Sequence, residues 1–199
     1  MTAIPIDESD LVARLRAKDD DAFTLLVRTY MGRLLRVARR FLKSEEDARD
    51  AVQDAFVSAF KSIDTFKAGS TLATWLHRIV VNSALMRLRT QRRHPEEEID
   101  DLLPKFQADG HQVRDSVDWS ESAEEMLARE ETREQVRKAI DMLPETHRVI
   151  LIMRDIEEMT TEEVAAALGI TTTAAKVRLH RARQALRTLL DRDFGKEQA

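Results

Sequence analysis

The side chains best suited to reading DNA lie in residues 171–190, a stretch with five cations and no acid. At 100° per residue, a helix there turns a threonine, a valine and an arginine to one side, with two more cations on the flanks. Arginine can contact a guanine edge, valine a thymine methyl group, and lysine a phosphate. We therefore predict a helix that reads duplex DNA, with a solvated helix face as the alternative. The candidate contacts are Thr173, Lys176, Val177, Arg178 and Arg181.

A second group of residues suits an unstacked base. The segment FKAGSTL contains a glycine, and we predict that a new helix starts near Thr71. On that helix Arg78, Asn82 and Arg89 fall within about 40° of one another, with Trp75 at the edge. Aromatic, amide and guanidinium groups beside a polar loop can hold an unstacked base and its backbone. The alternative is that the tryptophan belongs to the core, as most helical tryptophans do.

Two other charged features are candidates for binding. The helix predicted over residues 47–63 carries a polar side, which is usually solvated but can dock a basic partner helix. Its members are Asp47, Asp50, Gln53 and Asp54. Arg148 lies early in a helix predicted to begin near Pro144. It can contact a DNA phosphate or form a surface ion pair.

Charge is distributed unevenly along the chain, although the formal net charge is only -4. Residues 75–93 hold five arginines and no acid, whereas residues 94–125 hold eleven acids against two cations, a balance of -9. The acidic segment also contains Pro95, Pro104 and Gly110, and its apolar residues show no sustained period. We therefore predict an acidic linker, residues 94–129, that is extended with at most short helical pieces. It joins two domains, residues 8–93 and residues 130–194.

The elements that present the DNA-reading helix are predicted from the run MTTEEVAAALGIT. Thr160 can cap a helix and Glu163 can complete a capping box, while Gly169 permits a tight turn. Ile170 fills the corner, and Thr171 caps the next helix. This pattern predicts a helix-turn-helix, with an ordinary helical hairpin as the alternative. The side of the second helix predicted to face the core carries Ala175, Leu179, Ala182 and Leu186.

The first domain is also predicted to be helical. The helix over residues 47–63 is amphipathic, and its buried side is predicted to consist of Ala48, Val52, Ala55, Phe56, Ala59, Phe60 and Ile63. Apolar residues between Leu11 and Phe41 supply the helices that it packs against. With five glycines and four prolines in 199 residues, the composition favours an all-α fold of two helical domains.

Composition also argues against several classes of protein. The chain has no cysteine, which excludes disulfides, thiol nucleophiles and cysteine-bound zinc. It has no apolar run long enough to span a membrane and no leader pattern, so we expect no membrane insertion and a cytoplasmic location. Its five histidines are scattered, and no glycine loop suited to phosphates is present. We expect no enzymatic activity, cofactor or metal.

Long ordered segments in both halves resemble one known family. They are EDARDAVQDAFVSAFKSIDTF, FKAGSTLATWLHRIVVNSALMRLR and LPETHRVILIMRDIEEMTTEEVAAALGITTTAAKVRLHRARQAL. The chain resembles the extracytoplasmic-function (ECF) group of bacterial sigma factors, the smallest class of the sigma-70 family. The resemblance implies a transcription initiation factor that binds core RNA polymerase and directs it to promoters.

The resemblance also implies roles for the candidate residues. In such proteins the first domain engages the clamp helices of the largest polymerase subunit, a contact that falls here on Asp47, Asp50, Gln53 and Asp54. It also recognises the -10 element, with a loop that forms a pocket for a flipped non-template base. Asn82 assists that pocket, whereas Trp75 and Arg78 support strand separation. The loop residues are Phe66, Lys67, Gly69, Ser70, Thr71 and Leu72.

The second domain and the linker acquire roles in the same way. The second domain binds the duplex -35 element through Lys176, Val177 and Arg181, with Arg148 beside them. In this group the linker threads the active-site cleft and RNA exit path of the polymerase, a role we expect for residues 94–125. Members of the group are often held inactive by an anti-sigma factor, commonly membrane-anchored.

The main rival is a dimeric helix-turn-helix repressor or activator that acts without entering the polymerase. Such a protein reads two equivalent duplex half-sites through its own symmetry. Here the two basic regions differ, because one combines a loop with an aromatic stripe suited to single strands. The sequence therefore favours two unlike DNA-binding modules.

Overall fold

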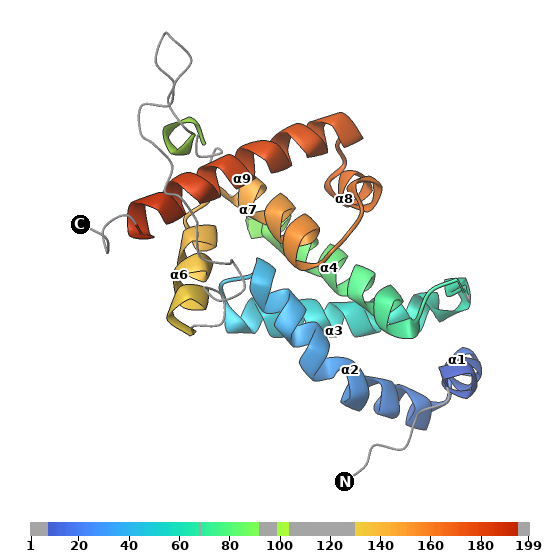
Figure 1. The fold of residues 1–199 in the computed structure, drawn as a ribbon. Helices are drawn as coiled ribbons and strands as arrows, with labels where there is room; N and C mark the ends of the chain where they lie inside the picture. The colour runs from blue at the N-terminus through green and yellow to red at the C-terminus, as the bar shows by residue number, and fades with distance from the viewer. Residues whose placement is uncertain (1–7, 68, 92–98, 104–129, 195–199) are drawn as a thin grey trace. The chain divides into compact units, whose positions relative to one another are not determined.

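The computed structural model describes residues 8–67, 69–91, 99–103 and 130–194. The chain divides into two compact units, Met1–Arg93 and His94–Ala199. Within the described ranges the regular elements are all helical, as predicted (Figure 1). Each unit has its own core, and each is described separately below.

The first unit is built around three long helices. A short helix, α1 (Glu8–Arg16), precedes α2 (Asp20–Phe41), α3 (Glu45–Ser62) and α4 (Leu72–Gln91). Helices α2, α3 and α4 pack against one another, and a 3-10 turn, η1 (Ile63–Thr65), follows α3. Most of the buried residues of α3 are alanines. Their small side chains leave space that larger side chains from α2 and α4 can fill. The fully buried large side chains include Phe41, Leu15, Leu26, Leu34, Ile63, Leu72, Leu76, Val52, Val80 and Val81.

The helix predicted over residues 47–63 is confirmed, with its start two residues earlier. Ser44 caps α3 by accepting a hydrogen bond from the Asp47 backbone N–H at 3.3 Å. The prediction that Phe60 is buried is wrong, since this residue is 40% exposed. Its ring lies 4.4 Å from that of Phe23, centroid to centroid, and the Lys18 Nζ lies 4.8 Å from its centroid. Ala51, which the pattern did not select, is buried instead.

The second unit contains four helices among its described residues. They are α6 (Glu130–Asp141), α7 (Glu145–Leu151), α8 (Thr161–Leu168) and the long α9 (Thr172–Phe194). A 3-10 turn, η2 (Asp100–Leu102), packs against α9, as do α6, α7 and α8. The predicted start of α7 near Pro144 is confirmed, with Pro144 at the N-cap. Helix α9 is therefore the element around which this unit is organised.

A wide helical turn, η3 (Ile152–Ile156), continues α7 and was not predicted. It is a π-helix, closed by a hydrogen bond from the Glu157 N–H to the Ile152 carbonyl at 2.9 Å. The Arg154 Nη1 then donates to the Met159 carbonyl, which fixes the chain just before Thr160. Asp155, within this turn, accepts a hydrogen bond from Arg183 of α9.

Candidate nucleic-acid interfaces

The turn between α8 and α9 has the geometry predicted for a helix-turn-helix. The Glu163 N–H donates to the Thr160 Oγ1 at 3.2 Å, and the Thr160 N–H donates to the Glu163 Oε2 at 2.8 Å. Gly169 ends α8 with φ at 68°, in the left-handed region that favours glycine. The Ala174 N–H donates to the Thr171 Oγ1 at 3.1 Å, which caps α9. The capping box, the glycine turn and the second cap are all confirmed.

Helix α9 turns the predicted sides toward the core and toward solvent. Ala175 and Ala182 are buried and Leu179 is 9% exposed, whereas Leu186 is only half-buried. Ala185 and Leu189 extend the buried side beyond the prediction. On the other side Val177 is 56% exposed, beside exposed Thr173 and Lys176. An exposed valine among polar neighbours is available for contact with an apolar group such as a thymine methyl.

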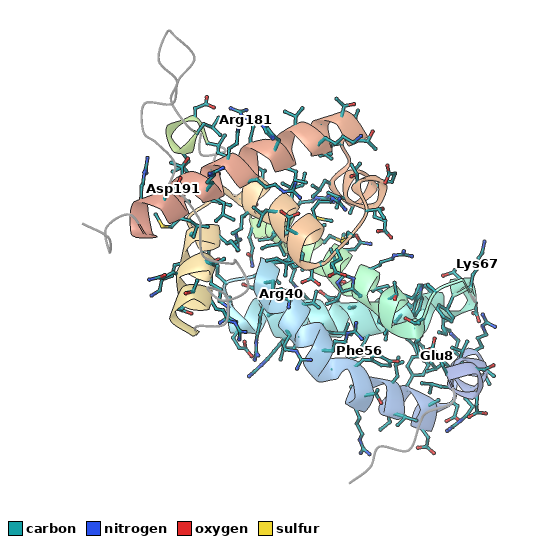
Figure 2. The ribbon with its side chains drawn as sticks, in the orientation of Figure 1. Glu8, Arg40, Phe56, Lys67, Arg181 and Asp191 are labelled. Carbon is teal, nitrogen blue, oxygen red and sulfur yellow. The ribbon has the colours of Figure 1, made fainter. Side chains whose placement is uncertain are left out.

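The cations of α9 differ in what holds them. The Arg181 Nη2 forms an ion pair with the Asp100 Oδ1 of η2. Figure 2 labels Arg181 on α9. Arg183 donates to both carboxylate oxygens of Asp155, at 2.9 and 2.6 Å, and this hydrogen bonding raises the pKa of Arg183. Among the described residues, Lys176 and Arg178 have no ion-pair or hydrogen-bond partner. On this side of α9, exposed Lys176 and half-buried Arg178 are therefore available to a phosphate.

Arg148 is not placed where a phosphate contact requires it. The residue is only 4% exposed, and its Nη1 lies 3.6 Å from the Asp141 Oδ1. A DNA contact would have to pull a buried guanidinium away from its carboxylate, which is strongly unfavourable. We therefore assign Arg148 a structural role and do not retain it among the proposed DNA contacts.

The loop before α4 is held at both ends by α1. The Arg16 Nη2 donates to the Phe66 carbonyl at 2.7 Å, and the Leu72 N–H donates to the Glu8 Oε1 at 2.6 Å. Figure 2 shows Glu8 and Lys67 at the same end of the first unit. These contacts join residues 50 and 64 positions apart, so the sequence pattern carried no signal for Arg16 or Glu8.

The predicted loop residues divide into exposed and buried sets. Lys67 and Gly69 are exposed, Ser70 is half-buried, and Thr71 caps α4 by accepting from the Thr74 N–H at 3.1 Å. Phe66 and Leu72 are buried, at 6% and 0% exposed. Neither buried side chain can contact a base without leaving the core, so we assign both to positioning the loop.

The stripe predicted on α4 is present. Arg78, Asn82 and Arg89 are exposed, and Trp75 is half-buried. The Trp75 ring packs edge-on against Phe66 with centroids 5.5 Å apart. The Trp75 ring thus packs partly against the core, as the structural alternative predicted, while part of it faces solvent. Its contact with an unstacked base stays a prediction.

The acidic side of α3 includes a cation from α4. Arg87 lies 3.1 Å from Asp50, 3.0 Å from Asp54 and 3.9 Å from Asp47, measured between guanidinium nitrogens and carboxylate oxygens. Gln53 is exposed beside them. Arg87 is one of the five arginines in the acid-free segment 75–93, but packing of α4 on α3 brings it to the acidic side. The face therefore keeps a net negative charge, with its carboxylates gathered around one guanidinium.

Other classes of site are not seen in the described part of the chain. Residues there form no group of three or more His, Asp or Glu side chains that could hold a metal ion. None of the helices in those ranges combines the length and apolar character needed to cross a membrane. The features that remain are the solvent side of α9 around Val177, the loop and stripe of α4, and the acidic side of α3.

Comparison with known proteins gives matches over both units. Residues 26–94 match the family model for sigma-70 region 2, and residues 133–186 match the model for sigma-70, region 4. The RNA polymerase sigma-H factor of Pseudomonas aeruginosa is 31% identical over 180 residues, which cover 90% of this chain and 91% of the relative. The ECF RNA polymerase sigma-E factor of Escherichia coli is 32% identical over 177 residues, covering 88% and 90%.

A solved structure agrees with these matches. The sigma factor RpoE of Bartonella quintana, in complex with the anti-sigma factor NepR, aligns with a TM-score of 0.52 and 25% identity, covering 84% of this chain and 96% of that one. The family models fall on the unit with the loop and stripe and on the unit with the helix-turn-helix, so the matched regions carry the described sites. The chain belongs to the extracytoplasmic-function group of sigma factors, in the sigma-70 family.

Proposed function

We propose that this chain binds core RNA polymerase, recognises the -10 and -35 elements of promoters and directs promoter melting. The observation that carries this proposal is the presence of two unlike nucleic-acid surfaces on two separate units. One is a capped helix-turn-helix with an exposed valine and cations, and the other is an exposed loop beside an aromatic stripe. A repressor that reads two equivalent duplex half-sites has no use for the second surface.

Recognition of the -35 element is assigned to the solvent side of α9. Val177 suits a thymine methyl group, and Arg181 suits a guanine edge once it leaves Asp100. Lys176 and Arg178 suit phosphates, which set the register of the helix in the groove. Thr173, near the start of α9, completes this set.

Recognition of the -10 element is assigned to the loop and to α4. The exposed residues Lys67 and Gly69 border the space for a flipped base, with Asn82 supplying an amide. Trp75 is half-buried, and the part of its ring that faces solvent offers a stacking surface for a base of a separated strand. Arg78 supplies a cation for the backbone of that strand.

Polymerase binding is assigned to the acidic side of α3. Asp47, Asp50 and Asp54 lie one to two helical turns apart, and Gln53 is exposed between them. A basic helix of the polymerase can align with this row, because opposite charges favour that register. RNA synthesis itself belongs to the polymerase, and the sigma factor contributes binding and strand separation in the cytoplasm.

The linker and an anti-sigma factor supply regulation in this proposal. Residues 94–125 would occupy the cationic RNA path of the polymerase until the transcript displaces them. Neutralising the acids from Glu96 to Asp101 is expected to change abortive synthesis or promoter escape. Initiation kinetics that do not change would contradict this role. Most of this segment lies outside the described residues.

The test is reconstitution with core RNA polymerase. We expect the chain to copurify with the core enzyme and to support run-off transcription from specific promoters. Sequencing the DNA retained by the holoenzyme identifies those promoters and supplies the probes used below. The proposal fails if the chain neither associates with core polymerase nor enables initiation at any start site.

A further inference from the structure

Helix α2 carries a basic face that the sites described so far do not use. All five of its arginines lie within an arc of about 140° at 100° per residue. Each is exposed, and exposed Lys43 follows just beyond the helix. No acid occurs between Asp21 and Glu45. We call this set the α2 basic face: Arg28, Arg33, Arg36, Arg39, Arg40 and Lys43.

Most of this face is not needed for contacts within the unit. Among the described residues, Arg28, Arg33, Arg36 and Lys43 have no ion-pair or hydrogen-bond partner. Arg39 is the clear exception, since it donates to both carboxylate oxygens of Glu45 at 2.8 and 2.6 Å. Arg28, Arg33, Arg36 and Lys43 therefore remain available to an external anion.

Stabilisation of the helix itself does not account for the pattern. Cations interact favourably with the helix dipole only in the last turn. Arg39 and Arg40 occupy that turn, but Arg28, Arg33 and Arg36 precede it. Like charges so close on one face repel one another, which a partner of opposite charge relieves.

The face lacks what a protein partner or a single strand requires. Between the arginines, the arc holds only Thr29 and Gly32, both exposed. Protein interfaces depend on central apolar or aromatic anchors, and single-strand surfaces depend on aromatic rings for stacking. From Arg28 to Arg40 the face extends about 18 Å along a straight helix. A duplex carries roughly ten phosphate charges over the same length of its axis.

We propose that the α2 basic face is a further DNA-binding surface, which contacts the phosphates of duplex DNA without reading its sequence. It adds to the -10 and -35 surfaces and supplies affinity that does not depend on the promoter. Its signature is therefore electrostatic: each cation that neutralises a phosphate contributes to the salt dependence of binding.

The test compares the full-length chain with Arg28→Gln/Arg36→Gln, using a random-sequence 30-bp duplex and the matching single strand as probes. Binding is measured at several salt concentrations, starting low. We expect the slope of log affinity against log salt to fall by roughly 1.8 on the duplex and by less on the single strand. The matched control, Arg137→Gln/Lys138→Gln, removes two exposed cations from α6 and is expected to leave the slope unchanged.

Three results would overturn the proposal. They are an unchanged slope in the α2 variant, an equal fall in the control, and a loss confined to the single strand. Unchanged DNA binding in this assay, together with weaker binding to core polymerase in a separate titration, would show instead that the face docks a protein. Because the probes contain no promoter and the assay no polymerase, its outcome is independent of the proposed function.

Discussion

Arg181, on the DNA-reading side of α9, forms an ion pair with Asp100 of η2, 81 residues earlier in the chain. The neighbouring Ile99 is 4% exposed, so an apolar anchor holds η2 beside the helix. An acid from the predicted linker, which here belongs to the second unit, thus pairs with an arginine proposed to contact the -35 element. With the proposed DNA contact, DNA and Asp100 would compete for the same guanidinium.

This competition predicts that Asp100→Asn increases DNA affinity. In the full-length chain we expect the affinity for a duplex promoter fragment to rise about two- to fivefold. A change of this size corresponds to the free energy of one partly exposed ion pair. Fluorescence anisotropy measures the change. Glu162→Gln removes an exposed acid from α8 and serves as the control. An equal gain in both variants would mean that only net charge matters.

The contact between Glu8 and Leu72 predicts a loss of -10 recognition when it is removed. Glu8→Ala leaves the first N–H of α4 without its acceptor. We expect it to lower the stability of the first unit by about 1 kcal/mol, as the loss of other helix caps does. The holoenzyme should then bind fork DNA with a single-stranded -10 element more weakly, while -35 duplex binding stays the same. Glu8→Gln keeps an oxygen acceptor and should recover most of the loss. Equal weakening on both DNA probes would contradict a local role.

The position of Arg87 among three carboxylates predicts that removing it weakens binding to core polymerase. The change in net charge alone predicts tighter binding. Arg87→Gln makes the acidic side of α3 more negative, yet it releases three carboxylates that then repel one another. We expect affinity for core polymerase to fall roughly threefold, because binding must then order those side chains. Titration of labelled chain with core enzyme measures it.

A matched variant separates the two effects at that face. Arg49→Gln removes a cation that is paired with Glu45 on the same helix and does not join the three aspartates. If charge alone decides, both variants bind polymerase more tightly. If Arg87 positions the carboxylates, only Arg87→Gln weakens binding.

What could be predicted from the sequence depended on how far apart the interacting residues lie. The turn before α9 was predicted correctly because its determinants, from Thr160 to Thr171, are all local. The contacts of Glu8 and Arg16 with the loop were missed because they depend on how α1 packs. Arg87 was grouped with the wrong patch for the same reason, since counting charge along the chain does not show which helices are neighbours.

The burial of single residues within a helix was likewise predictable only where the position on the helix decides it. Helical rotation placed Val177 in solvent and Ala182 in the core correctly. It also placed Phe60 in the core, but this residue lies at the rim, where it packs on Phe23 and under Lys18. The π-helical turn η3 has no signature in hydrophobic periodicity, so its presentation of Asp155 to Arg183 could not be foreseen.

Two glycines predict stability changes of opposite sign. Gly169 adopts φ of 68°, so Gly169→Ala forces a β-carbon into the left-handed region and is expected to destabilise the second unit by about 1–2 kcal/mol. Gly32 lies within α2, and a β-carbon added there would have no neighbouring atom within 4 Å, so Gly32→Ala should stabilise the first unit by about 0.5–1 kcal/mol. Amide hydrogen exchange, followed separately in α8–α9 and in α2, assigns each change to its unit. Equal stability of Gly169→Ala and the unsubstituted chain would show that the turn before α9 does not need the left-handed conformation.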